Sequence, residues 1–234
     1  MDFMNPMMWG GGNMWIYFLA AMIIPMAAQG YLMSIFGRYK RKRVTSSLTG
    51  HEVARRMLDR NGLHNVRIEI TKGKLSDHYD PRTRTVRLSP DIHDTPSIAA
   101  VSVAAHEVGH AIQHAEEFWP LRLRSALVPV VNVSNRLGFI IIIVGIMLEM
   151  FTIARFGIIL IAALFIFQLV TLPVELDASS RAMVGMEEMN ILYDNGEKRG
   201  ARKVLRAAAL TYVAALVVAL LEMLRWIAII NRRR

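Results

Sequence analysis

Two histidines four residues apart, with a glutamate between them, are the side chains of this sequence best suited to chemistry. They are His106 and His110, and Glu107 directly follows the first histidine. Because residues four apart lie on one face of an α-helix, both imidazoles can reach the same metal ion. The Glu107 carboxylate can then reach a water on that metal without ligating the metal itself. This spacing predicts two ligands and the general base of a zinc hydrolase.

The residues around the two histidines favour a metal site. Between Val103 and Ile112, Glu107 is the only acidic or basic residue apart from the histidines, and both positions before His110 are small or apolar. A helix buried beneath an active site has no room for other charges. Since so short a motif also occurs by chance, the alternative of two helix histidines that hold no metal stays open here.

A third protein ligand is required, because a catalytic zinc takes three and leaves one position for water. Glu175 is the favoured candidate, since it lies where a predicted membrane helix returns the chain to the side of the histidines. The alternative is a solvated acid at a helix N-terminus, which the helix dipole favours. His114 is the second choice, because it is turned about 80° away from His106 on a helix. Asp177 is either an acceptor that orients a histidine ligand or a plain N-terminal acid.

A zinc peptidase also needs a donor for the oxygen of the attacked carbonyl group. Three side chains are candidates for this role: His78, Tyr79 and Tyr212. The alternating segment 83–88 predicts a strand to whose edge an extended peptide substrate could add.

Hydrophobic residues make up 53% of the 234 residues and are concentrated in blocks. A helix that crosses a bilayer needs about 20 mostly apolar residues. We therefore predict four transmembrane helices, in the segments 15–37, 137–153, 156–174 and 207–230. Polar residues at 132–136 interrupt the pattern before the second helix. In the fourth, Glu222 and Arg225 can pair on one face, and a buried amphipathic helix is the alternative.

The net charge of +9 indicates a membrane partner and no nucleic acid, because the basic residues cluster beside the predicted spans. The segment 38–43 carries five positive charges, which predicts that it lies in the cytoplasm. We therefore expect a multi-pass protein of the cell membrane with its active site on the cytoplasmic side. The basic end 231–234 would then lie outside, against the same trend. No cleavable signal peptide is expected. The sequence has no cysteine, which excludes disulfides and thiolate ligands.

Apolar periodicity and turn residues predict the elements between the spans. They are a helix at 48–61 with Thr49 as N-cap, strands at 66–71 and 83–88, a loop at 90–96, a helix from Ser97 to about Glu117 that Trp119–Pro120 ends, an outer turn at 152–155, and a helix from Glu175 to about Tyr193. The fold class expected is a mainly α integral membrane protein with about four transmembrane helices and a zincin-like α+β catalytic domain on the cytoplasmic face.

Five consecutive segments follow from this pattern. They are an N-terminal segment with the first transmembrane helix at 1–37, the first part of the catalytic domain with the histidine helix at 38–126, a transmembrane hairpin at 127–174, the second part of the catalytic domain with the third-ligand helix at 175–206, and the last transmembrane helix with its basic tail at 207–234.

Five longer motifs are spread over nearly the whole chain from about residue 14: Leu48–Ala54, Asp77–Thr83, Ser97–Gln113, Pro173–Ser179 and Ala207–Ala215. Together they resemble the YugP-type membrane zinc metallopeptidases. The order of elements is also similar to that of HtpX-like membrane gluzincins. Those proteases carry an acid four residues after the third ligand, where this sequence has Ser179, so Asp177 is the candidate to replace it. The resemblance implies zinc and peptidase activity, and it names no substrate.

The function expected is therefore a zinc endopeptidase in the lipid bilayer, acting on peptides or proteins, with membrane proteins among the candidate substrates. The alternative is a membrane scaffold or adaptor that keeps a structural zinc. Glu107 argues against the scaffold, because a purely structural site has no use for an unligated carboxylate there. A transporter is disfavoured, since the predicted spans hold few charges beyond Glu222 and Arg225.

Overall fold

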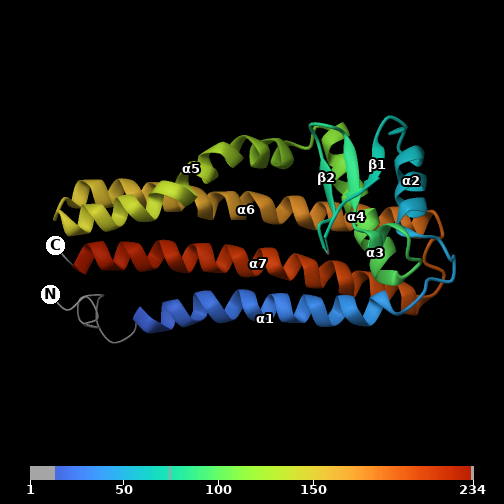
Figure 1. Cartoon of the computed structure of the whole chain (residues 1–234), viewed down its shortest axis with the longest axis horizontal. Coiled ribbons are helices and arrows are strands. Elements are labelled where there is room, and N and C mark those ends of the chain that lie inside the picture. The colour runs from blue at the N-terminus through green and yellow to red at the C-terminus, as the bar shows by residue number, and fades with distance from the viewer. Residues whose placement is uncertain (1–13, 74, 233–234) are drawn as a thin grey trace. The chain divides into compact units, whose positions relative to one another are not determined.

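The computed structural model describes residues 14–73 and 75–232, which form long helices and one small sheet (Figure 1). The elements are α1 (Met14–Lys40), α2 (Gly50–Arg60), β1 (Arg67–Ile70), β2 (His78–Asp80), β3 (Thr85–Leu88), α3 (Pro90–His93), α4 (Ile98–Ala115), α5 (Trp119–Met147), α6 (Phe151–Glu188) and α7 (Asn195–Arg232). The start of the predicted first segment, 1–13, and the last two residues of the basic tail lie outside the described residues. The mainly helical class is confirmed.

The chain divides into two compact units. The span unit contains Met1–Gln29, of which 14–29 are described, together with Leu123–Leu172 and Thr211–Arg234. The site unit contains Gly30–Arg122 and Pro173–Leu210. Residues of α1, α5, α6 and α7 belong to both units.

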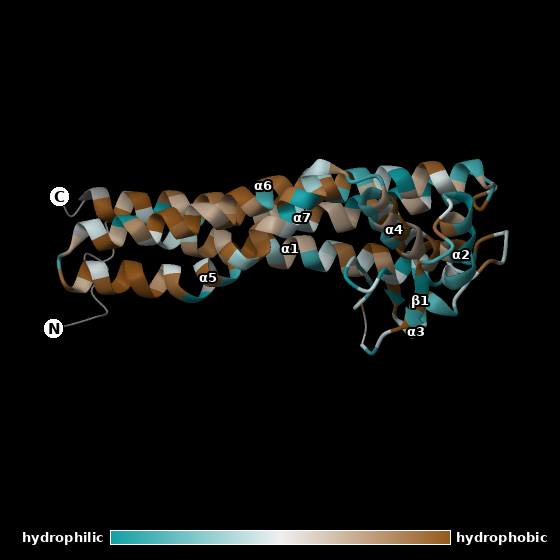
Figure 2. Ribbon diagram, turned by 90° about the horizontal axis from the view of Figure 1, so that it is seen from above, coloured by the Kyte–Doolittle hydropathy of each residue, from teal (hydrophilic) through white to brown (hydrophobic). Residues whose placement is uncertain are grey.

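Within the described part of the chain, three helices are long and apolar enough to cross a membrane: Trp15–Lys40, Thr152–Glu188 and Asn195–Ile230. Figure 2 shows the long hydrophobic stretches of α1 and α6. A fourth span results if the two parts of α5, Trp119–Ser134 and Arg136–Met147, count as one crossing, although they are bent by 41°. The bend falls where polar residues interrupt the apolar pattern. The structure therefore agrees with the prediction of four spans only if the bent helix α5 is counted as one of them.

The turn between α5 and α6 lies at 148–150, and the prediction of a turn at 152–155 is wrong. The polar residues that suggested the later turn lie in the first helical residues of α6. Gly145 lets the two helices approach here, because a Cβ at this position would meet the backbone nitrogen of Ala154 at 2.5 Å. Small residues at such crossings are typical of helices packed in membranes.

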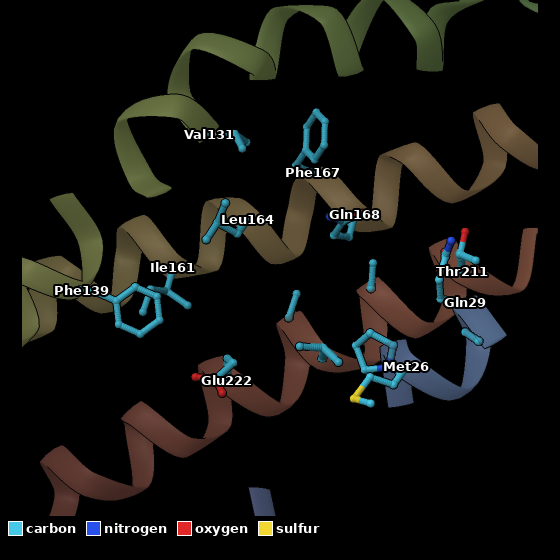
Figure 3. Close-up of a pocket in the computed structure, with 15 residues that line it drawn as sticks. Met26, Gln29, Val131, Phe139, Ile161, Leu164, Phe167, Gln168, Thr211 and Glu222 are labelled. Atoms are coloured by element: carbon cyan, nitrogen blue, oxygen red, sulfur yellow. The ribbon is translucent and has the colours of Figure 1, made fainter. Parts of the chain in front are cut away.

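A cavity of about 890 Å³ lies within the span unit and is lined mainly by apolar side chains, among them Met26, Leu164 and Phe167 (Figure 3). Glu222 also lines this cavity. It accepts a hydrogen bond of 2.6 Å from Arg225, so the predicted ion pair is confirmed.

Helix α4 is central to the site unit, where it contacts α2, α3, β2 and β3. The hydroxyl of Ser97 caps it by accepting a hydrogen bond from the Ala100 N–H. The buried face of α4 contains many alanines, whose small side chains let other elements pack closely. The predicted helix at 48–61 is confirmed as α2, which begins with a reciprocal capping box between Thr49 and Glu52.

The sheet has the order β1-β3-β2, with β1 parallel and β2 antiparallel to β3. The expectation that the strand at 83–88 offers its own edge to a peptide is therefore wrong, since β3 is the central strand. A short strand that the sequence pattern did not reveal, His78–Asp80, pairs with it and forms one edge of the sheet. The other edge is β1.

Two prolines lie at helix starts where the sequence suggested breaks. Pro90 opens the one-turn helix α3 within the predicted loop 90–96. Trp119–Pro120 begins α5, whereas α4 has already ended at Ala115. A proline in the first turn removes no helical hydrogen bond, because the N–H groups there have no partner within the helix.

Helix α6 runs without a break from Phe151 to Glu188 with Pro173 inside it, so no separate helix begins at Glu175. Proline removes one hydrogen bond from a helix but need not end it when packing holds both sides. Likewise, the basic segment before the last predicted span is the first part of the single helix α7.

Candidate metal centre

Helices α4 and α6 bring two histidines and a glutamate together in the site unit. The Oε2 atom of Glu175 lies 3.2 Å from Nε2 of His106 and 3.6 Å from Nε2 of His110. One possible ligand atom from each of the three residues lies within 4.8 Å of the others. In a tetrahedral zinc site with bonds of about 2.1 Å, ligand atoms are about 3.4 Å apart. The spacing and chemistry of these donors therefore fit a zinc ion.

The three side chains are largely removed from solvent. The exposed fraction is 14% for the His106 side chain, 12% for that of His110 and 2% for that of Glu175. A carboxylate so deeply buried needs a positive partner, because its desolvation is costly. A divalent cation held between it and the two imidazoles supplies such a partner.

The approach of α4 to α6 depends on Gly109, the residue before the second histidine. A Cβ added to Gly109 would lie 2.5 Å from the carbonyl oxygen of Ala178 and 3.0 Å from its Cα. Ala178 lies three residues after Glu175 on α6, about one helical turn away. The missing side chain therefore lets the backbone of α6 come close enough to present Glu175 to the histidines.

Gln113 determines which nitrogen of His110 is available to a metal. Its Nε2 donates hydrogen bonds of 2.8 Å to the carbonyl oxygen of Val174 and to Oδ2 of Asp177. Its Oε1 lies 3.0 Å from Nδ1 of His110 and must therefore accept. Nδ1 of His110 thus carries the hydrogen, which leaves the lone pair of Nε2 directed at Glu175.

Ser179 takes the corresponding position beside His106. Its Oγ lies 3.2 Å from Nδ1 of His106, the nitrogen that does not face Glu175. Ser179 is the residue that stands where the HtpX-like proteases carry an acid. Asp177 bonds to neither histidine; it accepts from Gln113 and from Nε of Arg181, the latter at 2.6 Å. Asp177 therefore orients His110 indirectly, through the amide of Gln113.

Glu107 is buried, with 8% of its surface exposed, and it lies outside the cluster of three ligands. Its Oε2 accepts a hydrogen bond of 3.0 Å from the backbone N–H of Tyr79 in β2. This bond ties the edge strand of the sheet to the helix of the histidines and orients the carboxylate.

The remaining predicted site residues lie in different places. Nδ1 of His114 is 2.8 Å from the Tyr79 hydroxyl, and His114 is not part of the ligand cluster. Burial raises the pKa of Tyr79, which keeps its hydroxyl protonated. His78 is exposed and bonds to the carbonyl of Ser76; as its neighbour in a strand, it points away from the face of Tyr79. Tyr212 belongs to the span unit.

The electrostatics of the centre link metal binding to protons. Burial lowers the pKa of His110, but the nearby carboxylates of Glu175 and Glu107 raise it more, so the net pKa lies above the ordinary value. Protons and a metal ion therefore compete for the same atoms.

A family model described as "Putative neutral zinc metallopeptidase" matches residues 14–231 of this sequence. The chain belongs to this family. Among curated proteins, "Putative membrane protease YugP" of Bacillus subtilis (strain 168) is 46% identical over 211 residues, which cover 90% of this chain and 93% of that protein. No solved structure matches the chain. Membership of this zinc metallopeptidase family confirms the resemblance noted in the sequence and implies zinc as the metal of the His106–His110–Glu175 site.

The sequence analysis did not predict a supporting role for three residues at this candidate metal centre. Gln113 lies three residues after His110, Ser179 lies four after Glu175, and Gly109 directly precedes the second histidine. The spacings of three and four residues place Gln113 and Ser179 on the same helix faces as the ligands His110 and Glu175. This spacing could have indicated that both residues lie beside the metal centre. The role of Gly109 is visible only once the backbone of the second helix is known.

Proposed function

We propose that the chain is a membrane-embedded, zinc-dependent endopeptidase in which Glu107 acts as general base. One observation carries the proposal: an oxygen of Glu175 lies between the Nε2 atoms of two histidines, while a separate carboxylate, Glu107, is held beside them by a backbone N–H. A purely structural zinc site has no use for that second carboxylate. The family membership supports the same conclusion.

In this proposal His106, His110 and Glu175 hold the zinc ion. Bound zinc would polarise the scissile carbonyl and lower the pKa of a water to about 7. Glu107 accepts the proton of the attacking water and passes it to the leaving amine. The hydrogen bond from Tyr79 fixes Oε2 of Glu107, which leaves Oε1 to take the proton.

The hydroxyl of Tyr79 is the favoured donor to the carbonyl oxygen as negative charge develops there. Its strand is already tied to Glu107, and His114 holds the hydroxyl in place. His78 faces away from this side of the strand, which disfavours it for the same role.

The open edge of β2 is the proposed binding place for an extended peptide, in place of the strand at 83–88. Backbone hydrogen bonds to this edge would align the peptide with the strand that orients Glu107. The substrates in this proposal are peptides or proteins, membrane proteins included. The basic segment 38–43 supports an active site on the cytoplasmic side of the cell membrane.

Glu107→Gln tests the proposal, with Glu188→Gln as control because Glu188 is an exposed carboxylate on α6. Each full-length variant is purified in detergent, loaded with zinc to the same occupancy and assayed on a library of quenched fluorescent peptides. We expect hydrolysis by the wild type and the control, and a fall of at least about 100-fold for Glu107→Gln.

Hydrolysis by Glu107→Gln at the wild-type rate, with zinc retained, would show that Glu107 is not the base. If no peptide is cut, and a cell that depends on the protein tolerates Glu107→Gln but not its deletion, the scaffold alternative takes the place of the peptidase.

A further inference from the structure

A second pocket, with a volume of about 520 Å³, lies in the site unit and contains none of the metal-centre residues. Its lining comes mainly from two segments, the end of α1 with the residues that follow it and the start of α7 with the residue before it, and Ile98 of α4 completes it. Four of its lining residues are cations: Lys42, Arg43, Arg199 and Lys203. We call it the basic pocket.

The two carboxylates that line the basic pocket already accept hydrogen bonds from other groups of the chain. Oε1 of Glu197 accepts hydrogen bonds from the backbone N–H and the hydroxyl of Thr45, at 2.6 and 2.7 Å. Oε2 of Glu197 accepts from the N–H of Tyr193 at 2.7 Å. Oδ1 of Asp194 accepts from the N–H of Glu197 in the first turn of α7. These bonds tie the segment after α1 to the start of α7.

The four cations of the basic pocket have no carboxylate partner among the described residues. Among residues 14–73 and 75–232, no carboxylate oxygen lies within 4.0 Å of a side-chain nitrogen of Lys42, Arg43, Arg199 or Lys203. Lys42 lies over the ring of Tyr39 at 5.5 Å. The lining therefore carries four positive and two negative charges, and the N-terminus of the long helix α7 adds to the positive potential. The pocket is suited to an anion.

Both walls of the basic pocket adjoin apolar helices. Lys42 and Arg43 lie two and three residues after Lys40, where a candidate span ends. The apolar part of α7 begins at Ala207, four residues after Lys203. Cations at the ends of membrane helices attract the headgroups of anionic lipids. Two such segments, far apart in the sequence, here line one pocket.

We propose that the basic pocket binds the phosphate of an anionic phospholipid from the surrounding bilayer. The phosphate would face the four cations, and the side chains of Tyr39 and Ile98 provide an apolar wall for the glycerol end. Bound in this way, the lipid would reinforce the connection between the end of α1 and the start of α7. The occupant is a lipid and not a soluble anion, because both cationic segments continue into membrane helices.

Thermal unfolding of the full chain in a neutral detergent tests this assignment. The probes are dihexanoyl-phosphatidylglycerol, dihexanoyl-phosphatidylcholine and inorganic phosphate at equal concentration. We expect the anionic lipid to raise the melting temperature by at least about 3 °C, because it binds only the folded chain. The zwitterionic lipid and inorganic phosphate should leave it nearly unchanged. An equal shift with inorganic phosphate would overturn the lipid assignment in favour of a soluble anion.

A charge-matched pair of variants localises the effect. The pocket variant combines Lys42→Gln, Arg43→Gln, Arg199→Gln and Lys203→Gln, and the control combines Arg56→Gln, Lys72→Gln, Arg82→Gln and Arg84→Gln. The shift should be lost in the pocket variant and kept in the control. The proposal is wrong if the pocket variant keeps the shift, or if both variants lose it equally. Should the fourfold variant fail to fold, Arg199→Gln with Lys203→Gln alone should at least halve the shift.

Discussion

Gly109→Ala tests whether the close approach of α4 and α6 builds the metal centre. The added methyl group would lie 2.5 Å from the carbonyl oxygen of Ala178, and the next two contacts, at 3.0 and 3.1 Å, are also backbone atoms of that residue. Ordinary contact begins near 3.4 Å, so the helices must separate by about 0.9 Å at this point. Backbone cannot rotate away as the end of a side chain can.

The separation should weaken zinc binding more than it weakens the fold. A shift of about 0.9 Å would move Glu175 from zinc-bonding distance, about 2.1 Å, to about 3 Å if the metal stays with the histidines. We expect zinc affinity to fall by about 10- to 100-fold or more, which corresponds to about 1.4 to 2.8 kcal/mol. Overpacking lowers the stability of the fold by about 1–3 kcal/mol, whereas the higher helix propensity of alanine than of glycine raises it by about 1 kcal/mol. The two effects partly cancel.

Zinc affinity is measured by competition with a chromophoric chelator on detergent-purified protein. Gly185→Ala is the matched control, because its Cβ would meet the terminal methyl group of Met57 at 2.6 Å, and that flexible end can move aside. We expect the control to bind zinc like the wild type. Wild-type zinc affinity in Gly109→Ala would refute the reasoning that this glycine sets the distance between ligands.

Further predictions concern the neighbours of the ligands, the pH dependence and the fold. Gln113→Met, which removes the acceptor for Nδ1 of His110, should lower zinc affinity by about 10- to 100-fold in the same competition assay; unchanged affinity would mean that the amide does not orient the ligand. Tyr79→Phe should keep zinc but lower kcat/KM on any cleaved peptide by about 100-fold or more, and an unchanged rate would remove its hydroxyl from the reaction. Because the pKa of His110 is raised, protons should begin to displace zinc at a higher pH than for an ordinary histidine. Zinc affinity should therefore fall between pH 7.5 and 5.5 by more than the roughly 10-fold that one histidine with a pKa of 6.5 would give, and a smaller fall would contradict the shift. Thr49→Ala should destabilise the chain by about 1 kcal/mol through loss of the α2 cap, visible as a lower melting temperature, whereas Thr49→Ser should not.

The parts of the fold that were predictable from the sequence rest on local geometry. The spacing of His106 and His110 places both on one helix face whatever surrounds them, and the Thr49 cap depends on residues within one turn. Apolar length likewise predicts membrane helices without knowledge of their neighbours. The prediction of Glu175 as the third ligand needed one further assumption, namely that a helical hairpin returns the chain to the side of the histidines.

The parts that were not predictable depend on contacts between distant segments. Pro173 suggested a helix boundary, but α6 continues because its residues on both sides pack in helical form. The strand at His78–Asp80 is too short for a clear alternating pattern and forms only by pairing with β3. The hydrogen bond from Tyr79 to Glu107 depends on that pairing, so the orientation of the Glu107 carboxylate could not be predicted either.

The continuity of α6 also sets an order of events during biosynthesis. The two histidines are translated before the α5–α6 hairpin, and Glu175 emerges only after the apolar part of α6. A nascent chain that stops before this helix has two of the three ligands and no complete centre. Under the proposed function, a nascent chain would therefore lack hydrolytic capacity until the hairpin has been made.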